Sequence, residues 1–104
     1  MAAEPIEALC PLAEDAQAPA APARRLDSLD GKTIALLSND MFRADKVLAC
    51  VAEEVRRRYP RAKVIPWEEF PRVSAMGDVH RSVAEVTEAL RRRRPDAVVA
   101  STGA

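Results

Sequence analysis

The sequence contains few of the residues from which metal and redox sites are commonly built. Its 104 residues include two cysteines, Cys10 and Cys50, and a single histidine, His80. The cysteines form no Cys-x-x-Cys pair, and one histidine cannot complete a zinc-type ligand set. Cys10 falls in a proline-rich tail and Cys50 in a predicted helix, so no structural disulfide is expected between them. We therefore predict no metal site and no cofactor.

Glycine is scarce too, and the glycine-rich phosphate-binding loops are absent. A dinucleotide-binding domain carries Gly-x-Gly-x-x-Gly after its first strand, and a P-loop carries Gly-x-x-x-x-Gly-Lys followed by Ser or Thr. Neither pattern occurs in this chain. A phosphoacceptor receiver domain requires an aspartate at the end of its third strand, where this sequence has Ser101 and Thr102. These three classes of site are excluded.

The sequence also lacks long apolar runs and an excess of charge. No segment is long enough to cross a membrane, and the acidic amino terminus does not resemble a secretory signal. Sixteen basic residues balance sixteen acidic ones. The arginine runs at 56–58 and 91–94 fall at predicted helix carboxyl ends, where cations complement the helix dipole. We expect a cytoplasmic protein with no membrane and no nucleic-acid partner.

The chain divides into a leader and one folded unit. Residues 1–25 are rich in alanine and proline, and residues 1–23 carry four acidic residues without any lysine or arginine. Such a composition cannot bury enough apolar surface to offset the entropy of ordering, so we predict a disordered leader. One short helix around residues 6–10 remains an alternative. Residues 26–104 are predicted to form a single α/β half-domain with the order βαβαβ.

Continuous apolar runs indicate strands at 32–38, 62–66 and 96–101, because a strand buried on both faces of a parallel sheet does not alternate. Helices are predicted from residues 38–40 to about residue 59 and at 79–93. Ser38, Asn39 or Asp40 could each cap the first helix, and Asp78 the second. One turn of helix is expected near residues 68–70.

The apolar faces of the two helices follow from their spacing. On the first helix, Val47, Val51 and Val55 recur every four residues, with Ala44 and Leu48 alongside. Cys50, three residues beyond Val47, is expected to be a buried or half-buried small side chain. On the second helix, an apolar stripe begins with Val79 and Val83 and includes Val86 and Leu90. These residues are predicted to face the sheet.

The crossover lengths predict parallel strands in the order 2-1-3, with one helix on each face. The fold class is therefore α/β, a three-stranded parallel sheet that makes up an incomplete doubly wound domain. The third strand is left at an edge, and this edge offers a route to oligomerisation. The switch point, where ligands usually bind in such folds, falls between the first and third strands.

Two small polar loops should lie side by side at that switch point. The predicted binding residues are Ser38, Asn39, Asp40, Ser101, Thr102 and Gly103. Their hydroxyls, together with the N–H groups at the start of the first helix, could hold an anion or a carboxylate. Ordinary capping and turn chemistry explains the same residue types equally well, so both interpretations stay open.

Residues 29–40 (Leu-Asp-Gly-Lys-Thr-Ile-Ala-Leu-Leu-Ser-Asn-Asp) and 95–104 (Pro-Asp-Ala-Val-Val-Ala-Ser-Thr-Gly-Ala) resemble the front half of the UGSC (seleno)protein family. The resemblance covers residues 26–104. It implies that a selenocysteine- or cysteine-Gly-Ser-Cys motif follows the third strand, although these 104 residues do not contain it. It also implies a selenol or thiol redox site acting on a small-molecule or thiol substrate.

The resemblance suggests that the gene product is truncated at a UGA codon read as a stop, with the catalytic residues beyond Ala104. The chain is then the amino-terminal part of a redox protein, inactive alone. A second interpretation is a non-catalytic α/β binding or interaction module. A third, an enzyme that uses Cys50, has no cation or helix amino terminus nearby in sequence to activate the thiol.

Overall fold

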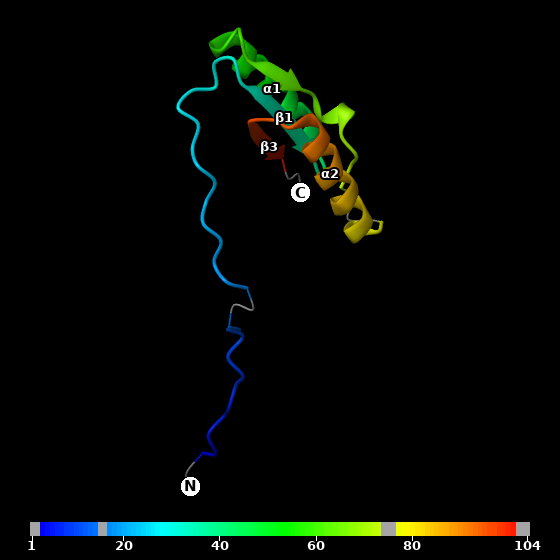
Figure 1. The fold of residues 1–104 in the computed structure, drawn as a ribbon. Helices are drawn as coiled ribbons and strands as arrows, with labels where there is room; N and C mark the ends of the chain where they lie inside the picture. Colours follow the sequence, from blue (N-terminus) through cyan, green and yellow to red (C-terminus); the bar gives the residue numbers. More distant parts are fainter. Residues whose placement is uncertain (1–2, 15–16, 74–76, 102–104) are drawn as a thin grey trace.

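The computed structural model describes residues 3–14, 17–73 and 77–101 (Figure 1). The elements, in chain order, are β1 (Thr33–Ser38), α1 (Ala44–Arg58), β2 (Lys63–Ile65), the 3-10 helix η1 (Trp67–Glu69), α2 (Val79–Arg93) and β3 (Ala97–Ser101). The predicted alternation of strands and helices is confirmed. The single helical turn after β2 begins one residue earlier than expected.

The three strands form one parallel sheet in the order β2-β1-β3, as predicted. β1 is central, and its residues Ile34 to Ser38 are aligned with the whole length of β3. Asp96 fixes the start of this alignment. Its backbone N–H donates to the carbonyl of Thr33, and its carboxylate Oδ2 accepts from the Thr33 N–H, both at 2.8 Å. The carboxyl ends of β1 and β3 therefore finish level with each other.

One face of the sheet packs against α1. Ile34 and Leu36 of β1 meet Leu48 and Ala52 of the helix, and Leu48 is completely buried. The continuous apolar run of β1 serves both faces of the sheet, because alternate residues point to opposite sides. Its even-numbered residues are directed to α1 and its odd-numbered residues to α2.

The opposite face packs against α2 and the connection that leads into it. Here Ala35 and Ile65 contact Ala89 from the helix and Phe70 from the connection, and Phe70 is only 5% exposed. The two helices thus cover opposite faces, as the topology predicted (Figure 1). Phe70 occupies the space that α2 leaves over β1 and β2.

The apolar faces of the two helices were predicted correctly in part, since Ala44 and Leu48 of α1 and Val86 of α2 are buried as expected. On α1 the buried stripe is Ala44, Leu48 and Ala52, and Val47 is 52% exposed, so its assignment to the core was wrong. On α2, Val79 and Val83 were likewise wrongly assigned and are about half exposed. The buried residues of α2 fall later in the helix, because its first turns project beyond the sheet (Figure 1).

The start of α1 also differs from the prediction. The helix begins at Ala44, and the residue before it, Arg43, has a φ of 64° and provides no side-chain cap. None of the three residues expected to cap the helix does so. The side chains of Ser38 and Asn39 accept hydrogen bonds inside the intervening loop, from the N–H groups of Asp40 and Met41, and so do not reach the first turn of the helix.

Asp78 caps α2 as predicted, since its carboxylate Oδ1 accepts from the N–H of Arg81 at 3.1 Å. Asp78→Ala removes this acceptor, and we expect the free energy of unfolding to fall by about 1 kcal/mol. Urea unfolding followed by circular dichroism measures the change. Asp78→Ser keeps an acceptor at the same position and should recover most of the loss. Equal destabilisation by both substitutions would contradict a capping role.

The described residues of the leader, 3–14 and 17–25, contain no helix or strand, and their side chains are exposed. The short helix considered around residues 6–10 is therefore not formed. The leader runs away from the sheet and joins β1 through a turn at Asp30–Gly31 (Figure 1). Gly31 has a φ of 70°, which glycine adopts without a steric penalty, and the N–H of Lys32 closes the turn on the carbonyl of Leu29 at 3.1 Å.

Candidate functional site

The candidate site is the edge of the sheet where β1 and β3 end. Ser38 and Ser101 are aligned across the two strands, and the N–H of Asn39 donates to the carbonyl of Ser101 at 3.4 Å. The structure thus brings three of the predicted site residues together. Thr102 and Gly103, the other predicted residues from the second loop, lie outside the described residues.

The loop after β1 is folded by its own side chains. The hydroxyl of Ser38 accepts from the N–H of Asp40 at 3.1 Å, and the amide oxygen of Asn39 accepts from the N–H of Met41 at 3.2 Å. Asp40 has a φ of 60°, a left-handed conformation that aspartate and asparagine tolerate better than most residues. Turn chemistry therefore accounts for these side chains locally. It also sets the direction in which the Asp40 carboxylate leaves the loop.

That carboxylate meets a cation from another part of the chain. Asp40 Oδ1 lies 2.9 Å from a guanidinium nitrogen of Arg72, which comes from the connection between η1 and α2. The same guanidinium lies 5.1 Å from the ring centre of Trp67, within cation–π range. Arg72 was missed from the sequence, because nothing near it in the chain indicates a partner 32 residues away.

Both groups of this ion pair are well exposed, with 56% of the Arg72 side chain and 42% of the Asp40 side chain accessible. We therefore expect a coupling energy below about 1 kcal/mol that decreases as salt is added. A double-mutant cycle with Asp40→Asn and Arg72→Gln, followed by urea unfolding at low and high salt, measures it. Asparagine preserves the left-handed backbone while removing the charge. A coupling of several kcal/mol that salt does not change would contradict this description.

Two further residues stand at the rim of the site. Phe42 is 70% exposed, and the guanidinium of the adjacent Arg43 lies 5.0 Å from its ring centre. The edge therefore carries two arginines, each beside an aromatic ring, and one carboxylate held by the first of them. An exposed ring and cations of this kind can contact an anionic or planar ligand.

The residues with shifted pKa values are remote from this edge. The pKa of Glu54 is lowered by hydrogen bonds from Arg57 and Arg58 near the carboxyl end of α1. The pKa of Arg61 is raised by its hydrogen bond to Asp30, beyond the opposite end of β1. These shifts reflect surface ion pairs, and they do not indicate an acid or base at the candidate site.

Both cysteines are free and exposed. The prediction that Cys50 would be a buried or half-buried small side chain was wrong, because the buried stripe of α1 runs through Leu48 and Ala52 instead. Within the described ranges there is no cluster of three or more metal-ligating side chains. The same part of the chain has no helix long and apolar enough to cross a membrane.

A comparison with known families decides the relationship. The sequence profile of the UGSC family matches residues 7–104, which is almost the whole chain. The chain belongs to the UGSC family. The resemblance noted in the sequence covers residues 26–104, whereas the match to the UGSC profile begins at residue 7. The match therefore includes most of the leader. No curated protein and no solved structure matches this UGSC chain.

Proposed function

We propose that this UGSC chain is the amino-terminal part of a selenol or thiol redox protein, and that it forms one wall of the redox site. The observation that carries the proposal is the family match over residues 7–104. In this proposal the nucleophile follows β3, in the selenocysteine- or cysteine-Gly-Ser-Cys motif that the resemblance implies. The described residues supply the substrate-facing surface of the site and no redox catalysis of their own.

The geometry supports this position for the site. Ser38 and Ser101 end neighbouring parallel strands at the same level, at the switch point where α/β proteins bind ligands. A selenol following β3 would be ionised at neutral pH, unlike an ordinary thiol with a pKa of about 8.5. Asn39 and Asp40 would then face it from the loop after β1, with Arg72 available for an anionic group of the substrate.

The coding sequence beyond Ala104 tests the proposal. It should read UGA, or a cysteine codon, followed in frame by codons for Gly-Ser-Cys, with a stem-loop nearby in the UGA case. Any other stop codon, or an unrelated reading frame, would contradict it. The protein translated through the motif should reduce a disulfide substrate, and the 104-residue chain should not.

The second candidate function is a non-catalytic binding or interaction module. The exposed Val98 of β3 favours it, because an apolar strand side chain open to solvent suits a covering partner. The outer edge of β3 could also pair with a second copy, giving oligomers through the sheet. A well-behaved monodisperse chain, with no motif in the downstream coding sequence, would support this candidate over the first.

A further inference from the structure

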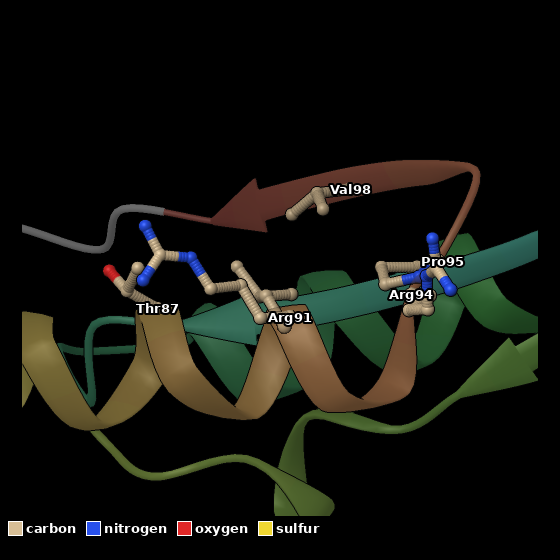
Figure 2. A pocket seen from close by; sticks show the side chains of 6 residues that line it. Thr87, Arg91, Arg94, Pro95 and Val98 are labelled. Carbon is tan, nitrogen blue, oxygen red and sulfur yellow. The ribbon is translucent and has the colours of Figure 1, made fainter.

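An open groove of about 670 Å³ lies between the second half of α2 and β3 (Figure 2). Figure 2 shows Val98 facing the helix from β3, with Thr87 and Arg91 opposite it. Val98 is 45% exposed although it lies within β3 and is aligned with the buried Ala35 of β1. The groove therefore has an apolar floor, formed by Val98 and Leu90, that the described fold leaves open to solvent.

The rim of the groove is cationic. Arg91 and Arg94 line it, and neither has a carboxylate within ion-pair distance in the described part of the chain. The neighbouring Arg93 differs, because it pairs with Glu69 at 2.9 Å. A segment that combines apolar side chains with acidic ones would match both the floor and the rim.

The leader has this combination. Ile6, Leu9 and Leu12 are 97%, 99% and 86% exposed, and they recur at every third residue. Glu4 and Glu7 have the same spacing. In a polyproline II helix, which has three residues per turn and which Pro5 and Pro11 favour, residues three apart share one edge. The apolar residues would then form one edge of the segment, and the acids the edge beside it.

We propose that residues 4–12 of the leader dock into the groove of their own chain. Ile6, Leu9 and Leu12 cover the apolar floor, and Glu4 and Glu7 pair with the arginines of the rim. The structure holds the leader away from the sheet, so the docked form is a second arrangement of the same chain (Figure 1). The UGSC match includes most of this segment, since it begins at residue 7.

The segment is longer than the groove itself, and the exposed stripe at the start of α2 extends the surface available to it. A polyproline II segment from Ile6 to Leu12 spans roughly 19 Å. Along α2, Val79 and Val83 lie on the same stripe as Thr87 and the groove, and both are about half exposed. From Val79 to Arg93 the helix is roughly 21 Å long, so the groove and this stripe together accommodate the segment.

The connection between the leader and the groove is short enough to favour docking within one chain over docking onto a second copy. Residues 22–26 lie beside Asp96 and Ala97, directly after the end of the groove at Arg94 and Pro95. The residues between Leu12 and Leu26 can span at most about 50 Å, which exceeds the two shorter dimensions of the molecule, 33 and 25 Å. Such a tether gives an effective concentration on the order of millimolar, well above that of a second copy in dilute solution.

A nitroxide on Cys10, in the full chain with Cys50→Ser, tests the docking. In a ¹⁵N-labelled sample the amide peaks of Leu90 and Val98 should be lost, and those of α1 on the opposite face of the sheet should keep their intensity. Equal intensities at the two places would overturn the proposal. In a mixture of spin-labelled unenriched chain and unlabelled ¹⁵N chain the groove peaks should survive; their loss would assign the groove to a second copy and overturn it too.

Charge reversal tests the pairing without a spin label. In the full chain, Glu4→Arg with Glu7→Arg should release the leader. The amide chemical shifts of Thr87 and Val98 should then move to the values of the uncovered groove. Arg91→Glu with Arg94→Glu should abolish docking as well. The four substitutions together restore opposite charges and should restore the docked shifts. Failure of the combined, folded variant to do so would overturn the assignment of Glu4 and Glu7 to the arginine rim.

Discussion

Phe70→Ala is expected to lower the free energy of unfolding by about 3–5 kcal/mol. Phe70 is 5% exposed and fills the space between α2 and the face of the sheet formed by Ala35 and Ile65. α2 itself buries only Val86 and Ala89, so it depends on this ring for much of its attachment. Urea unfolding followed by circular dichroism measures the loss, and amide exchange along α2 should increase more than along α1.

Phe42→Ala is the matched control, because the same side chain is removed from a position that is 70% exposed. Its effect should stay within about 0.5 kcal/mol. The comparison also reports on the candidate site. Phe70 anchors the connection that carries Arg72, so Phe70→Ala should weaken the Asp40–Arg72 pair, and the fluorescence of Trp67, the only tryptophan, should change with it. Equal destabilisation by the two alanine substitutions would contradict the packing described.

Leu48→Ala is expected to cost about 2–5 kcal/mol on the other face of the sheet. Leu48 is fully buried between Ile34, Leu36 and Ala52, and alanine would leave a cavity among them. A core built on three strands is thin, and whole domains are stable by only about 5–15 kcal/mol, so this substitution removes a large share of the stability. The midpoint of urea unfolding should shift to markedly lower concentration.

Val47→Ala is the control for Leu48→Ala, because it shortens a neighbouring side chain of the same helix that is not buried. Val47 is 52% exposed, and its substitution should change the free energy of unfolding by no more than about 0.5 kcal/mol. The contrast tests which stripe of α1 faces the sheet. A larger loss at Val47 than at Leu48 would mean that Val47, and not Leu48, faces the sheet, which would contradict the packing described.

The elements and their topology could be predicted because each has a strong local signal. The unbroken apolar run at the start of the folded unit is typical of a central parallel strand, and β1 is that strand. Pro60 and Pro95 mark the ends of the two helices, since proline excludes the helical conformation before it. With three strands and two long crossovers, handedness then leaves few topologies, and the order β2-β1-β3 follows.

The details that could not be predicted depend on contacts between distant residues. Apolar spacing identifies the side of α1 that contains Ala44 and Leu48, but it does not decide between Val47 and Ala52, and of these two only Ala52 is buried. The delayed start of this helix results from side chains closing the loop after β1. At the candidate site, the sequence identifies Ser38 and Ser101 by their position after strands. It cannot identify Arg72, whose partner is reached only through the fold.

The mass and selenium content of the protein isolated from its native cells test the central proposal most directly. An antibody against the folded unit would capture it, and intact mass spectrometry would then determine its length. We predict a species heavier than 11.4 kDa that contains one selenium atom, or the corresponding cysteine, directly after Ala104, followed by Gly-Ser-Cys. A native protein of 11.4 kDa, without selenium and without the motif, would contradict the account.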